Sequence, residues 1–144
     1  VELFGSPFLL PCLKPPYGEI AVVDLTTQQV VWRRGFGFMN IGLPYSAGSF
    51  VTAGGLIFNA GVMDSRLRAI SVDDGKLLWS TGLERSSGGT PMSYVSPRTG
   101  KQYVLVLEPA AGGREQLEES HQTDEVGEKE APAGGKVIAY ALAE

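Results

Sequence analysis

The sequence is poor in the residues and runs that define several protein classes. Its 144 positions hold one cysteine, one histidine and no stretch of 18 apolar residues. A single cysteine cannot form an internal disulfide, and a single histidine leaves no His/Cys cluster for zinc. Without a long apolar stretch there is no candidate for a membrane-spanning helix. The formal net charge of −4 disfavours a general nucleic-acid binder, because such proteins need basic surface for phosphates.

The negative charge is concentrated in one segment. From Arg114 to Glu130 there are seven acidic and two basic residues, so this stretch carries −5 and the rest of the chain +1. Glycine pairs bracket the surrounding segment, residues 112–135, which holds only two large aliphatic residues. This composition predicts a solvated, mobile loop, and an acidic contact for a basic partner is the alternative. The single histidine, His121, lies inside it and is expected to be solvated.

An internal repeat runs through the rest of the sequence. Residues 22–32 and 69–79 each consist of a short apolar strand, a polar turn, two aliphatic residues and a tryptophan. The two tryptophans are 47 residues apart, and the apolar stretches 56–60 and 103–107 repeat the same offset. A third copy of the first strand lies at 136–141, 70 residues after the second. The excess matches the acidic segment, which we interpret as an insertion between two strands of one unit.

Composition and spacing together predict an all-β fold. The repeated stretches are rich in β-branched and aromatic residues, and 19 glycines and 9 prolines supply turns between them. Asp73 to Lys76 is a tight hairpin signal, and Asp24 to Gln29 forms the same turn without a glycine. Four-stranded units about every 40 to 50 residues are typical of β-propeller blades. The strands suffice for about three blades, so the rest of a closed ring must be supplied from elsewhere.

Four stretches carry more specific motifs. They are Pro11-Cys12-Leu13-Lys14-Pro15-Pro16-Tyr17-Gly18, Ser49 to Ile57, Asp64-Ser65-Arg66-Leu67-Arg68-Ala69, and Gly89 to Tyr94 followed by Gly100 to Val104. With the two tryptophan repeats they resemble the C-terminal part of the quinoprotein dehydrogenases, in particular membrane-bound glucose dehydrogenase and its quinate and polyol relatives. The resemblance covers residues 6–113 and 135–143.

The resemblance implies that residues 1–144 are the C-terminal part of an eight-bladed propeller, with an acidic insert at about 112–135. The complete enzyme would oxidise a sugar or polyol hydroxyl with pyrroloquinoline quinone (PQQ) and Ca²⁺ or Mg²⁺, and pass electrons to ubiquinone. Such enzymes work on the periplasmic side of the bacterial inner membrane. Their catalytic Asp and metal ligands lie in earlier blades, so we expect this chain to be inactive alone.

The resemblance also assigns individual residues. Asp64 occupies the position of a family acid at the cofactor face, where it would accept a hydrogen bond from a cofactor-contacting side chain. An aspartate that caps a turn between two strands is the alternative. Trp32 and Trp79 are expected to be structural and to dock one blade on the next. Arg66 and Arg68 alternate with apolar residues, so both are expected on one exposed edge.

Two departures from the family pattern favour a second hypothesis, a non-catalytic propeller scaffold for protein binding or assembly. The family's long Pro- and Met-rich loop is short here, at residues 33–50. Its His-Gly-rich loop at the cofactor face is replaced by the acidic insert at 112–135. The close matches at Pro15 to Gly18 and Gly89 to Tyr94 favour the dehydrogenase.

Overall fold

The computed structural model describes residues 14–36, 47–61, 64–110 and 134–141. Within these ranges the only regular elements are nine β-strands: β1 (Glu19–Asp24), β2 (Gln29–Gly35), β3 (Ser49–Val51), β4 (Leu56–Asn59), β5 (Arg66–Ser71), β6 (Leu77–Gly82), β7 (Met92–Val95), β8 (Gln102–Glu108) and β9 (Lys136–Ala141). The all-β prediction is therefore confirmed. A search of the same ranges for a helix long and apolar enough to cross a membrane found none.

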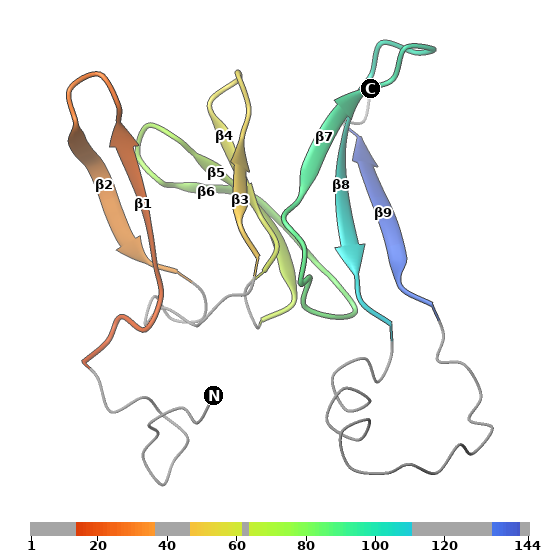
Figure 1. Cartoon of the computed structure of the whole chain (residues 1–144), viewed down its shortest axis with the longest axis horizontal. Coiled ribbons are helices and arrows are strands. Elements are labelled where there is room, and N and C mark those ends of the chain that lie inside the picture. The colour runs from red at the N-terminus through yellow and green to blue at the C-terminus, as the bar shows by residue number, and fades with distance from the viewer. Residues whose placement is uncertain (1–13, 37–46, 62–63, 111–133, 142–144) are drawn as a thin grey trace, which may run out of the picture.

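The strands form three antiparallel sheets that follow one another in chain order (Figure 1). They are β1-β2, then β3-β4-β5-β6, then β7-β8-β9. The 47-residue offset makes β1 and β2 the counterparts of β5 and β6, and it makes β4 the counterpart of β8. In the described residues the middle sheet therefore has four strands, the first has only the outer two, and the third has the inner three.

Two apolar clusters fill the spaces between neighbouring sheets. Because side chains alternate along a strand, β5 directs Ile70 toward the first sheet and Leu67 toward the third. Burying a large aliphatic side chain stabilises a fold by roughly 1.5–3 kcal/mol, so sideways stacking stabilises both faces of the middle sheet. The buried members are Ile20, Phe36, Ile57 and Ile70 in the first cluster, and Ala60, Leu67, Val104 and Val106 in the second.

The indole of Trp32 joins the first sheet to the second. Its Nε1–H donates a hydrogen bond of 2.6 Å to the carbonyl oxygen of Val72, in the β5–β6 turn. Its ring lies against Gly75, where an added Cβ would stand 2.9 Å from the ring carbons. Gly75 also has a φ of +67°, so this position requires glycine for two separate reasons. Arg34 reinforces the contact by donating to the Asp74 carbonyl oxygen at 3.0 Å.

The second tryptophan makes a different contact. Trp79 of β6 lies edge-on to Tyr140 of β9, with ring centroids 5.8 Å apart. It is 43% exposed, because no turn corresponding to the β5–β6 turn follows β9 within the described residues. The two tryptophans therefore hold repeated positions in unequal surroundings.

The β1–β2 turn reproduces the β5–β6 turn without its glycine. Gln28 stands at the position of Gly75 and adopts a φ of +57°, which a side chain with a Cβ rarely takes. The turn is held instead by Asp24, whose Oδ1 accepts from the backbone N–H of Thr26 at 2.7 Å and of Thr27 at 3.3 Å. These donors hold the pKa of Asp24 below its ordinary value. A lowered pKa contributes stability at neutral pH that is lost as the pH falls through the folded-state value.

Replacing Gly75 by alanine should separate the tryptophan contact from backbone strain. Gly75 and Gly100 both have a φ of +67°, but an added Cβ at Gly100 has no atom within 4 Å. We expect Gly100→Ala to cost about 1 kcal/mol of unfolding free energy, and Gly75→Ala about 3 kcal/mol because it also displaces Trp32. Denaturant unfolding followed by circular dichroism measures both. Equal losses would mean that the Trp32 contact contributes nothing.

The opposite change at the first turn should stabilise the protein. Gln28→Gly relieves a left-handed conformation, and we expect it to raise the unfolding free energy by about 0.5–1 kcal/mol. Gln29→Gly is the control, because Gln29 lies in β2 and a glycine within a strand is destabilising. Thermal unfolding of the two variants checks the pair. A lower melting temperature for Gln28→Gly would contradict the account of this turn.

Candidate functional site

Successive strands meet at two opposite ends of the sheets. The turns β1–β2, β3–β4, β5–β6 and β7–β8 lie at the upper end in Figure 1, and the other ends of the strands lie at the lower end. The loop at 33–50 joins β2 to β3, and the acidic insert at 112–135 joins β8 to β9. Residues 37–46 and 112–133 of these two segments lie outside the described residues.

Buried polar side chains gather at this lower end. In the described part of the chain they are Asn59, Arg68, Ser87 and Glu108, each less than 9% exposed. Asn59 and Glu108 end β4 and β8, Arg68 stands opposite Asn59 on β5, and Ser87 lies in the β6–β7 connection. Burying such groups is costly unless they are bonded. The lower end is therefore the candidate functional site.

Asp64 and Arg68 form an ion pair beside Phe36, the residue that follows β2. Arg68 Nη2 contacts Asp64 Oδ2, and the two side chains are only 8% and 18% exposed. The guanidinium also donates from Nη1 to the Arg66 carbonyl oxygen at 3.3 Å, and it lies 5.2 Å from the centre of the Phe36 ring. Asp64 thus lies at the lower end, just after β4 and before β5, and it binds a charged partner.

The expectation that both arginines are exposed is wrong for Arg68. Arg66 is exposed at the start of β5, whereas Arg68 is buried two residues further on. Both side chains belong to the same face of β5, as the alternation predicted. That face packs against the first sheet, and Phe36 covers Arg68.

Three buried oxygen atoms at this end have no hydrogen-bond donor among the described residues. They are Asp64 Oδ1, Asn59 Oδ1 and Glu108 Oε2. The Asn59 amide nitrogen is used, since it donates to Ser49 Oγ at 3.0 Å. Unsatisfied buried acceptors of this kind are uncommon in proteins. The lower end therefore presents three acceptor atoms without a donor among the described residues.

A second polar contact fixes the β6–β7 connection to the neighbouring sheets. Glu108 Oε1 accepts from the backbone N–H of Glu84 at 2.7 Å, and Leu83 N–H donates to the Ser65 carbonyl oxygen at 2.8 Å. Lys136 Nζ bonds Glu84 Oε2 at 2.6 Å, and this ammonium group holds the pKa of the exposed Glu84 carboxyl below its ordinary value. Ser65 directly follows Asp64 in the sequence. The bond from Leu83 to Ser65 therefore links the Glu84–Glu108 contact to the Asp64–Arg68 ion pair.

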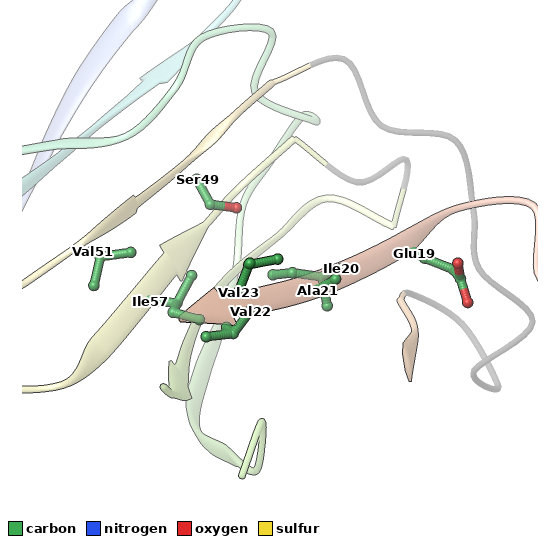
Figure 2. Close-up of a pocket in the computed structure, with 8 residues that line it drawn as sticks. All are labelled: Glu19, Ile20, Ala21, Val22, Val23, Ser49, Val51 and Ile57. Atoms are coloured by element: carbon green, nitrogen blue, oxygen red, sulfur yellow. The ribbon is translucent and has the colours of Figure 1, made fainter. Parts of the chain in front are cut away.

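A groove of about 340 Å³ beside β1 is a poorer candidate (Figure 2). It lies between strands β3 and β4 and the edge of β1 that pairs with no strand in the described part of the chain. In the middle sheet, two strands fill the corresponding place next to β5. We therefore interpret the groove as the space for the inner strands of the first blade. Its lining is Glu19, Ile20, Ala21, Val22, Val23, Ser49, Val51 and Ile57.

Sequence reasoning named Asp64 as a candidate but did not name the buried polar residues around it. The sequence did contain a signal for them, a polar or charged residue inside or directly after an apolar run. This occurs at Asn59, Arg68 and Glu108. No group of three His, Cys, Asp or Glu side chains able to hold a metal occurs in the described ranges.

Glu108 should act through its hydrogen bond and not through its charge. Glu108→Gln keeps an oxygen for the Glu84 N–H, so we expect a change in unfolding free energy of at most about 0.5 kcal/mol. Glu108→Leu leaves that N–H without its acceptor and should cost about 1–3 kcal/mol. Denaturant unfolding of both variants measures the difference. A loss for Glu108→Gln as large as that for Glu108→Leu would show that the negative charge itself is required.

Comparisons with known proteins give this geometry a context. The family model described as glucose/ethanol/alcohol dehydrogenase, beta-propeller domain (PQQ) matches residues 1–104. The chain is 39% identical to the quinate/shikimate dehydrogenase (quinone) of Acinetobacter baylyi, and 34% identical to the quinoprotein glucose dehydrogenase of Escherichia coli. Each match covers 96% of this chain, which spans only 17% of either relative's length.

A solved structure shows the same fold. The europium-containing methanol dehydrogenase superposes on 62% of this chain and 14% of its own, with a TM-score of 0.50 and 32% identity. The predicted fold class, blades of a β-propeller, is thereby confirmed. The chain belongs to the PQQ-binding glucose/ethanol/alcohol dehydrogenase β-propeller family.

Proposed function

We propose that this chain is the C-terminal part of a PQQ-dependent dehydrogenase that oxidises a hydroxyl of a sugar or polyol. The relatives named for glucose and for quinate or shikimate support this substrate class. We further propose that electrons pass to ubiquinone and that the enzyme works on the periplasmic side of the bacterial inner membrane. The chain's partners would be the remaining blades of the same propeller.

The observation that carries the proposal is the set of unsatisfied buried acceptors at the lower end. PQQ carries carboxylates, so an anionic Asp64 would not bind it directly. It fits instead a cationic donor from another blade, held between Asp64 Oδ1 and the cofactor. When bound, PQQ supplies the acceptor for the two electrons that the substrate's hydroxyl carbon loses. Asp64 would orient the donor side chain and would not take the substrate's proton.

The catalytic base and the metal are proposed to come from blades outside this chain. This part of the proposal rests on the family resemblance alone, from which we expect the catalytic Asp in earlier blades. We propose Ca²⁺ or Mg²⁺ as the metal, acting as a Lewis acid on the cofactor. Metal analysis of the complete enzyme that finds a lanthanide in their place would contradict this part.

The alternative, a non-catalytic propeller scaffold, keeps one supporting observation. The segments at 33–50 and 112–135, which differ from the family pattern, connect β2 to β3 and β8 to β9, and the described ends of these strands lie at the lower end. A scaffold would retain the blades and the tryptophan contact but would have no use for PQQ.

A chimera separates the two functions. In it, this chain replaces the matching 17% of the A. baylyi quinate/shikimate dehydrogenase. We expect the chimera to bind PQQ and to reduce a dye or a ubiquinone analogue with quinate, whereas the isolated chain with PQQ and Ca²⁺ shows no activity. Asp64→Asn in the chimera should weaken PQQ binding by about tenfold, because the donor loses its charged acceptor.

The controls are the unmodified relative and a chimera with Arg98→Ala, which lies in the exposed β7–β8 turn at the upper end. Both should bind PQQ normally. A folded chimera that does not bind PQQ would overturn the dehydrogenase proposal and favour the scaffold. Turnover by the isolated chain would overturn the claim that the catalytic base lies elsewhere.

A further inference from the structure

Arg68 is a buried cation held on three sides. Its Nη2 contacts Asp64, its Nη1 donates to the Arg66 carbonyl oxygen at 3.3 Å, and the Phe36 ring lies 5.2 Å from its central carbon. A buried arginine is costly unless it is paired, and a planar guanidinium keeps its orientation better than a flexible ammonium. Phe36 follows β2 directly, so the first sheet helps to fix the group that pairs with Asp64.

This arrangement determines which oxygen of Asp64 is available. Oδ2 is engaged by Arg68, while Oδ1 is buried and has no donor among the described residues. A carboxylate free to rotate would exchange its two oxygens between these places. With Arg68 in position, the Asp64 carboxylate has one fixed orientation, and Oδ1 is always the oxygen that it presents.

Asn59 makes the same place an acceptor site. It stands opposite Arg68 in the β4–β5 register, its amide nitrogen donates to Ser49, and its Oδ1 has no donor among the described residues. Asn59 ends β4 and Asp64 precedes β5, and each neighbours Arg68. Two such acceptors call for a partner with N–H groups, and a guanidinium or ammonium side chain has them. An anion would be repelled by Asp64.

We propose that Arg68 is a positioning residue, which orients Asp64 so that its Oδ1, together with Asn59 Oδ1, receives a cationic side chain from another blade. The inference rests on the proposed function, in which that side chain contacts PQQ. It assigns Arg68 no contact with the cofactor. Its effect on PQQ binding must therefore pass through Asp64, and this is what distinguishes it from a merely structural role.

A double-mutant cycle in the chimera tests the inference. The variants are Arg68→Met, Asp64→Asn and the combination, with Arg66→Met as the matched control because Arg66 is an exposed arginine on the same strand. The PQQ dissociation constant is measured by titration of the apo-chimera, and kcat and KM for quinate are measured on the loaded enzyme. Circular dichroism and the melting temperature establish that each variant is folded.

We expect Arg68→Met and Asp64→Asn each to weaken PQQ binding by about tenfold, and the combination to bind no more than about twofold more weakly than Asp64→Asn. The KM for quinate should stay within about twofold, and Arg66→Met should leave every quantity unchanged. If Arg68→Met lowers the yield of folded protein, Arg68→Lys runs the same cycle. Arg68→Lys keeps the positive charge, and we expect it to weaken PQQ binding about threefold. This effect should disappear in the Asp64→Asn background.

The outcomes separate this inference from the proposed function. If Asp64→Asn weakens PQQ binding while Arg68→Met and Arg68→Lys do not, only the positioning role is overturned. A full additional loss from the arginine substitution in the Asp64→Asn background overturns it as well, since Arg68 would then act independently of Asp64. Normal PQQ binding by Asp64→Asn removes the proposed role of Asp64, and the inference about Arg68 falls with it.

Discussion

The contact between the Trp32 indole and the β5–β6 turn is the constraint on which the rest of the structure depends. A single blade buries neither of its faces, so it must stack sideways on its neighbours. Trp32 fixes that stacking with a hydrogen bond to Val72 and a ring laid against Gly75. The apolar cluster around Ile20 and Ile70 lies beneath this contact and depends on the same spacing.

Stacking sideways buries two kinds of side chain between the blades. The apolar side chains interlock, and the cost of burying them is low. At the lower end Asn59, Arg68 and Glu108 are also buried, and their burial requires partners. The partners present within the described residues satisfy only part of their capacity. This imbalance directs the functional proposal to that end, because the proposed further blades would supply donors there.

Much of the fold was predictable from the sequence, because it depends on local pattern and repetition. The 47-residue offset identified the repeated strands, and Asp73 to Lys76 predicted the hairpin that Gly75 completes. Burial at Arg68 was not predictable. Alternation along β5 gave its face correctly, but only the stacked first sheet shows that Phe36 covers that face. The free oxygens of Asn59 and Glu108 likewise depend on contacts between distant segments, which a single strand's pattern does not contain.

The exchange rates of the two indole N–H protons test the central claim most directly. Trp32 and Trp79 occupy repeated positions, but within the described ranges a docking turn is found for Trp32 alone, and Trp79 is 43% exposed. In the isotope-labelled chain, NMR hydrogen exchange should show a strongly protected Trp32 Nε1–H and a rapidly exchanging Trp79 Nε1–H. Equal, rapid exchange of both protons would contradict the claim that this contact joins the first two blades.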